Sequence, residues 1–154
     1  MAELKARLRS DLTTAMKSQD RLRTATLRML LAAITNEEVS GKQARELSDA
    51  DVLKVLARES KKRGESAEIY TQNGRGDLAA NERAEAQVID EYLPTPLTDA
   101  ELADLVDTAI AEVAEDIGER PSMRQMGQVM KAATALAAGK ADGARISTAV
   151  KDRL

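Results

Sequence analysis

The stretch Tyr92-Leu-Pro-Thr-Pro96 decides how this chain is divided. Proline lacks a backbone N–H and disfavours helix for the residue before it, so two prolines in three positions end a helix and impose an extended segment. Shortly after it, Thr98-Asp-Ala-Glu101 has the spacing of a capping box and predicts the start of another helix. We therefore expect a domain of residues 1–93, a linker of residues 94–97 and a domain of residues 98–154.

Upstream of the prolines, apolar residues recur at helical spacing. Leu4, Leu8, Leu12 and Met16 stand four residues apart and predict one face of a first amphipathic helix. Three more helices are expected before the linker. Their predicted limits are an Asp20 cap with Gly41 at the end, a Ser48-to-Asp51 capping box with the helix running towards Tyr70, and an Asp77 cap after the turn 73–76 with the helix running to Tyr92.

Downstream, three helices are expected. The first runs from the Thr98 capping box to Gly118, the second from a Ser122 cap to Gly139, and the last from Asp142 to the end. The composition agrees with an all-helical chain. It includes 27 Ala and 17 Leu, which are strong helix formers, but only two Tyr and no Phe or Trp. The predicted fold is all-α, with a four-helix N-terminal domain joined by the Pro-containing linker to a small three-helix C-terminal domain.

Composition also excludes most kinds of catalytic site. The chain has no Cys and no His, which removes disulfides, thiolate nucleophiles, the usual zinc ligands and the usual general base. A serine nucleophile would need a Ser–Lys pair, and neither S-x-x-K nor G-x-S-x-G occurs. No catalytic, metal-binding or cofactor-binding residue is predicted. No secretory signal and no apolar run of membrane-spanning length occurs, so we expect a cytoplasmic protein without a membrane partner.

Charge is distributed unevenly although the net charge is only −3. Residues 76–119 carry one base against 13 acids, whereas residues 120–154 carry seven bases against two acids. The basic segment favours an anionic partner, while the simpler interpretation is that charged side chains only solvate helix faces. The basic run Lys61-Lys62-Arg63 also has two interpretations. It is either a phosphate-binding patch or part of an exposed helix face on which Glu59 and Arg63 form an ion pair, and we favour the exposed face.

The C-terminal basic segment contains the candidate binding residues. Gly127 is expected inside a helix, where glycine costs about 1 kcal/mol relative to alanine, so either another helix packs closely there or a ligand approaches the backbone. Helix N-termini attract phosphate, although Asp142 as a cap would occupy some of the donors at the last helix. The hypothesis is an RNA-binding site composed of Gly127, Lys131, Lys140, Gly143 and Arg145.

Several motifs together resemble the GatB/YqeY family over nearly the whole chain. In the first half they are Leu27-Arg-Met-Leu30 with Ala32-Ala-Ile34, and Lys61-Lys-Arg63 with Glu65-Ser66. In the second half they are Glu91-Tyr-Leu-Pro94 with Leu97, Met126-Gly-Gln-Val-Met-Lys131, Ala141-Asp-Gly143 and Val150-Lys151.

The resemblance implies a function as well as a fold. A related module forms the tail of the B subunit of the tRNA-dependent amidotransferase, where it grips tRNA while other domains carry the chemistry. The resemblance therefore implies a non-catalytic tRNA-binding accessory module, with amidotransferase subunits or a translation enzyme as further partners. Two alternatives stay open: a protein-interaction module of the translation apparatus, and carbon–nitrogen ligase activity with glutamine as donor only as part of a larger complex.

Overall fold

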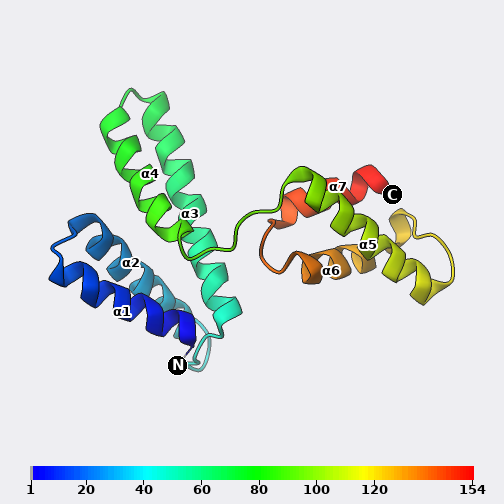
Figure 1. Cartoon of the computed structure of the whole chain (residues 1–154), viewed down its shortest axis with the longest axis horizontal. Helices are drawn as coiled ribbons and strands as arrows, with labels where there is room; N and C mark the ends of the chain where they lie inside the picture. Colours follow the sequence, from blue (N-terminus) through cyan, green and yellow to red (C-terminus); the bar gives the residue numbers. More distant parts are fainter. Residues whose placement is uncertain (1) are drawn as a thin grey trace. The chain divides into compact units, whose positions relative to one another are not determined.

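A computed structural model describes residues 2–154, and the only regular secondary structure among these residues is helical (Figure 1). The chain divides into two compact units, the first ending at Leu93 and the second beginning at Pro94. The described elements are α1 (Glu3–Lys17), α2 (Arg21–Glu38), α3 (Asp49–Gln72), α4 (Gly76–Asp90), α5 (Asp99–Ile117), the short 3-10 helix η1 (Met123–Gln125), α6 (Met126–Ala137) and α7 (Gly143–Arg153). The all-α prediction is confirmed.

The first unit is built from two helical hairpins. In Figure 1, α1 lies beside α2, and α3 lies beside α4. Their inward faces bury an aliphatic core, because apolar residues three and four positions apart share one face of a helix. The buried members of this core are Leu8, Ala15, Leu27, Leu30, Ile34, Leu47, Val52, Val55, Leu56, Ile89 and Tyr92.

Polar groups also join the helices of the first unit. The Lys5 ammonium on α1 lies 2.8 Å from a carboxylate oxygen of Glu38 at the end of α2. Arg63 on α3 donates to Glu59 at 3.0 Å and to Glu85 on α4 at 3.2 Å, and its side chain is only 15% exposed. The Glu59–Arg63 pair was expected, but Arg63 is largely buried rather than on an exposed face.

The second unit packs α5 against α6 and α7 around a separate core. Its buried residues are Leu102, Val106, Ala109, Ile110, Val113, Val129, Ala133, Ala137, Ile146 and Val150. The segment before α5 is attached to this unit, because the Leu97 N–H donates to the Lys140 carbonyl at 2.8 Å. This bond holds the start of α5 against the turn between α6 and α7.

Most predicted helix caps are present. Asp20 and Ser48 accept hydrogen bonds from the backbone N–H groups of Arg23 and Asp51. Thr98 and Glu101 form the full capping box, and Gly118 ends α5 in the left-handed conformation at φ 78°. At Ser48 only half of the predicted capping box forms, because the Asp51 carboxylate instead lies 3.4 Å from Arg45.

Three predicted helix limits are wrong. Asp77 does not cap α4: the N-cap is Arg75, and its guanidinium donates to the Asp77 carboxylate in the first turn at 3.3 Å. Gly41 does not end α2, which stops at Glu38, where the backbone carbonyl accepts from the Arg45 N–H at 2.9 Å. Similarly α4 stops at Asp90, and Tyr92 lies beyond it, hydrogen-bonded to Asp11 of α1.

The expected sixth helix has a different start. Ser122 caps η1, a short 3-10 helix, and α6 begins only at Met126. Gly127 therefore lies in the first turn of α6 and not in a helix interior. At the other end, Ala138 is the left-handed C-cap with φ 49°, followed by Gly139 with φ 82°, so two successive residues turn the chain towards α7.

Candidate nucleic-acid interface

The outer face of α6 carries two of the predicted residues, Gly127 and Lys131. Both are exposed and stand four positions apart, while Val129 and Ala133 turn inwards to the core. Within residues 2–154 the Lys131 ammonium has no ion pair and no hydrogen bond. This face therefore presents an uncommitted cation beside a glycine.

The surroundings of Gly127 decide between the two reasons proposed for it. A Cβ atom added at Gly127 would meet no atom within 4 Å other than those of its own helix turn and chain neighbours. The close-packing explanation is therefore wrong, because no neighbouring helix approaches this position. The backbone of α6 is instead accessible from outside at Gly127, as approach by a ligand would require.

Lys140 lies in the turn between α6 and α7. Its backbone is fully used, since its N–H donates to the Ala137 carbonyl at 2.9 Å and its carbonyl accepts from Leu97. Its exposed side chain has no ion pair within residues 2–154. The pKa of the Glu101 carboxyl is lowered, chiefly by its hydrogen bond from the Thr98 N–H, and the positive charge of Lys140 adds to this effect.

Gly143 and Arg145 lie in the first turn of α7. The Asp142 carboxylate accepts the Arg145 N–H at 2.8 Å and so occupies one of the free donors at this helix N-terminus. The Arg145 guanidinium donates to the Leu97 carbonyl at 2.9 Å and to Asp99 at 3.0 Å. A Cβ atom at Gly143 would meet no atom within 4 Å. Arg145 thus anchors α7 to the start of α5.

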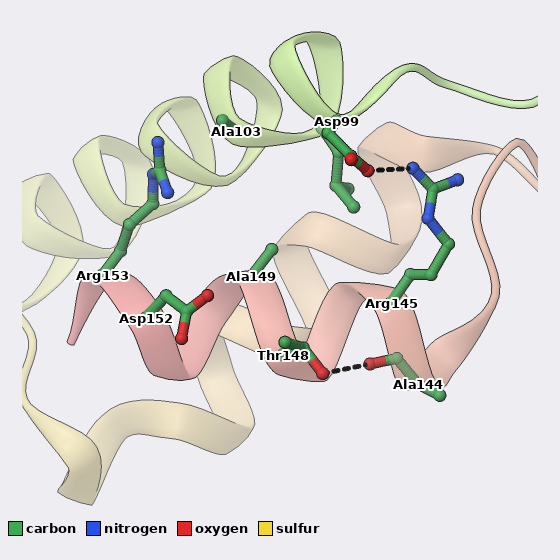
Figure 2. Close-up of a pocket in the computed structure, with 9 residues that line it drawn as sticks. Asp99, Ala103, Ala144, Arg145, Thr148, Ala149, Asp152 and Arg153 are labelled. Atoms are coloured by element: carbon green, nitrogen blue, oxygen red, sulfur yellow. Dashed lines mark hydrogen bonds and ion pairs between the residues drawn. The ribbon is translucent and has the colours of Figure 1, made fainter.

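A groove of about 550 Å³ separates α5 from α7, and Figure 2 shows Arg145 and Arg153 reaching across it from α7. Arg153 donates to Asp107 at 2.8 Å, in the way that Arg145 donates to Asp99. Ala103, Ala144 and Ala149 also line this groove. Both cations of this groove are already paired, so it presents little net positive charge.

The predicted site residues therefore fall into two groups within the second unit. Gly127 and Lys131 share the outer face of α6, whereas Lys140, Gly143 and Arg145 surround the turn that leads into α7. Within the described part of the chain no group of three His, Cys, Asp or Glu side chains could hold a metal ion. The arrangement offers cations and accessible backbone, which are the groups that bind phosphate esters.

Comparison with known proteins assigns the chain to a family. A family model described as "Yqey-like protein" matches residues 5–154. The chain belongs to the YqeY-like family. The resemblance seen in the sequence motifs is thereby confirmed for this family.

Fungal relatives of this YqeY-like protein carry a mitochondrial name. A protein of Meyerozyma guilliermondii called "Altered inheritance of mitochondria protein 41, mitochondrial" is 32% identical over 124 residues, which is 79% of this chain and 64% of the relative. Its namesake in Eremothecium gossypii is 32% identical over 80% of this chain and 68% of the relative. An uncharacterized protein of Schizosaccharomyces pombe is 34% identical over 59% of this chain and 72% of its own length. This chain thus spans about two thirds of the length of these relatives.

The structure of this YqeY-like protein adds two cations that sequence reasoning missed, Arg124 and Lys151. Arg124 is exposed, stands three residues before Gly127 and seven before Lys131, and has no ion pair within residues 2–154. Lys151 on α7 is likewise exposed and unpaired in the described region. Both cations belong to the basic segment of residues 120–154, so the local excess of bases was the signal that could have found them.

The motif Glu91-Tyr-Leu-Pro94 of this YqeY-like protein anchors the end of the first unit. Glu91 pairs with Arg23 of α2 at 2.7 Å, and the Tyr92 hydroxyl donates to Asp11 of α1 at 2.5 Å. The Arg7 guanidinium lies 4.7 Å from the centre of the Tyr92 ring.

None of the helices in residues 2–154 combines the length and the apolar character needed to cross a bilayer.

Proposed function

We propose that this YqeY-like protein is a non-catalytic accessory protein that binds tRNA through the outer face of α6 and the adjoining turn. The observation that carries the proposal is that the accessible Gly127 and the unpaired Lys131 share the outer face of α6, while the unpaired Arg124 lies in η1 directly before this helix. The resemblance to the tail of the amidotransferase B subunit supports tRNA as the anion. Amidotransferase subunits or a translation enzyme are further proposed partners.

The fold favours recognition of duplex shape and backbone over stacking on single-stranded bases. The only aromatic residues are Tyr70 and Tyr92, and both belong to the first unit. Single-strand binding depends on aromatic platforms, whereas duplex RNA is contacted through phosphates and 2′-hydroxyls. Cations on a helix face and in a turn suit this second mode.

The number of uncommitted cations sets the expected salt dependence. Of the seven bases in residues 120–154, Arg120, Arg145 and Arg153 donate to groups of their own unit. Arg124, Lys131, Lys140 and Lys151 remain without an ion pair in the described chain. If all four contact phosphates of duplex RNA, log K should fall against log salt with a slope of about −3 to −4.

The test is fluorescence anisotropy of labelled total tRNA against the full chain at low and near-physiological salt. We expect the double substitution Lys131→Ala and Lys140→Ala to weaken binding and to reduce the salt slope by about 2. Gly127→Ala should also weaken binding although alanine is the better helix former, because its methyl group projects into the space that the backbone of the RNA occupies. The matched control is Lys42→Ala with Lys54→Ala, two exposed lysines of the first unit.

Unchanged affinity in the Lys131/Lys140 variant, or equal weakening in the control, would overturn this assignment. Two alternatives remain: a protein-interaction module of the translation apparatus, and carbon–nitrogen ligase activity only within a larger complex. Ammonia release from glutamine by the purified chain would contradict a non-catalytic role. tRNA occurs in both the cytoplasm and mitochondria. The proposed function is therefore compatible with the cytoplasmic location expected from the sequence and with the mitochondrial names of the relatives.

A further inference from the structure

A second basic feature lies in the first unit, at the corner where α1 leads into α2. A groove of about 530 Å³ is lined there by Met16, Gln19, Arg21, Thr24, Ala25 and Arg28. We call it the Arg21/Arg28 groove. Arg28 belongs to the motif Leu27-Arg-Met-Leu30, whose leucines are buried in the core while Arg28 itself is exposed.

The Arg21/Arg28 groove differs in charge from two other grooves in the described part of the chain. The groove between α5 and α7 contains Asp99 and Asp152 beside its arginines, and the groove around Arg45 and Arg58 contains Glu37 and Asp51. The Arg21/Arg28 groove is lined by two arginines and no carboxylate. Neither guanidinium has an ion pair within residues 2–154, and Arg28 only contacts the Met16 sulfur at 3.8 Å.

The position of Arg21 is not explained by the stability of α2. Arg21 is the first residue of this helix, and its first turn contains no acidic residue. The N-terminus of a helix carries partial positive charge, so a cation there is disfavoured, typically by about 0.3–1 kcal/mol. The nearest acid in sequence, Asp20, accepts the Arg23 N–H and lies 3.8 Å from the Arg23 guanidinium. An outside anion would offset the unfavourable position of Arg21.

Apolar side chains accompany this positive charge. Met16, in the wall of the groove, is 49% exposed, and Leu22, which follows Arg21, is 41% exposed. Exposed methionine beside arginine is characteristic of protein interfaces, where both residue types are enriched. A phosphate backbone would satisfy the arginines but would offer no apolar surface to the exposed side chain of Met16.

We propose that the Arg21/Arg28 groove docks an acidic amphipathic helix of a partner protein. Arg21 and Arg28 are seven residues apart on α2, which corresponds to about 10.5 Å along the helix axis. Two carboxylates about two turns apart on the partner can pair with them, while an apolar side chain between the carboxylates packs against Met16. Thr24 and Ala25 are small enough to let the two helices approach. This groove belongs to the first unit and α6 to the second, so the proposal does not rest on the proposed binding of tRNA.

The test uses the full chain, labelled with ¹⁵N, and a fluorescent alanine-based helical peptide. The peptide carries two glutamates seven positions apart with leucines between them. Two control peptides replace the glutamates by glutamine or the leucines by serine. The test variant is Arg21→Glu with Arg28→Glu, and the matched control is Lys61→Glu with Arg83→Glu, which changes the net charge equally on exposed positions of α3 and α4.

We expect the peptide to shift the amide resonances of residues 16–28 and both control peptides to bind more weakly. The Arg21/Arg28 reversal should weaken peptide binding by about tenfold or more, while the matched control stays within about twofold. Equal weakening in both variants would overturn the proposal, because the effect would then be one of net charge. A duplex RNA that displaces the peptide and shifts the same amides more strongly would also overturn it and identify a nucleic-acid groove.

Discussion

At the scale of single residues, two positions within residues 2–154 have a left-handed backbone without being glycine. Gln19 has φ 58° in the turn before α2, and Ala138 has φ 49° at the end of α6. For residues other than glycine this conformation brings Cβ close to the backbone and costs about 1–2 kcal/mol. Each position is held by the helices that it joins, so the strain is local and can be removed by substitution.

Ala138→Gly should therefore stabilise the protein. Because glycine adopts the left-handed conformation without this clash, we expect the free energy of unfolding to rise by about 1 kcal/mol. Ala135→Gly is the matched control, since Ala135 is exposed within α6 and glycine there should lower the free energy of unfolding by about 1 kcal/mol. Urea denaturation measures both, and a loss of stability in both variants would contradict the argument.

Whether a cation of the basic segment is available to bind a ligand also differs from residue to residue. Lys131 and Arg145 both belong to the basic segment, yet Lys131 has no partner in the described chain while Arg145 donates to Leu97 and Asp99. Arg145→Ala should consequently act on the stability of the second unit more than on RNA affinity. The salt slope distinguishes these roles, because only phosphate contacts change it.

At the scale of elements, Tyr92 joins the end of α4 to α1. Burial, together with the hydrogen bond to Asp11 and the negative charge of that carboxylate, raises the pKa of Tyr92 to about 12. The neutral hydroxyl is thus favoured in the folded state. As the pH rises above about 10, the unfolded chain loses its tyrosine proton first, so this contribution to stability is present below pH 10 and is lost as the pH rises towards about 12.

Tyr92→Phe tests this contribution. At neutral pH the loss of the hydrogen bond should lower the free energy of unfolding by about 1 kcal/mol. Between about pH 9 and pH 11 the wild-type protein should lose about 1 kcal/mol more than the variant, because only the wild-type protein has a tyrosine titrating at this position. Denaturant unfolding of both proteins at the two pH values measures the difference, and parallel pH profiles would exclude the role.

At the scale of the whole molecule, the two hydrophobic cores share no residue. We propose that residues 1–93 and 94–154 are independent domains, and each fragment should then unfold cooperatively by itself. The C-terminal fragment is small, and a core of this size rarely supplies more than about 3–5 kcal/mol, so its stability should be low. Circular dichroism with urea measures this, and an unfolded C-terminal fragment would show that the domains depend on each other.

The sequence alone determined the helices and most of their ends. Caps such as Asp20, Thr98 and Gly118 act within one turn, and the apolar spacing of each helix is a local pattern, so neither needs knowledge of distant residues. The predicted helix limits were wrong where the contact at a helix end involves a residue outside that α-helix. The Glu38 carbonyl at the end of α2 accepts from Arg45 in the following loop, and η1 moves Gly127 out of the predicted helix interior.

Only the tertiary structure decided which charged residues are available for binding. Asp99 is 46 residues from Arg145 and Asp107 is 46 residues from Arg153, so no local pattern could show that these cations are paired. The same applies to Arg21 and Arg28, whose lack of a partner follows from the absence of any carboxylate in the groove around them. The physical reason is that helix formation depends on neighbours in sequence, whereas pairing of charges depends on distances in space.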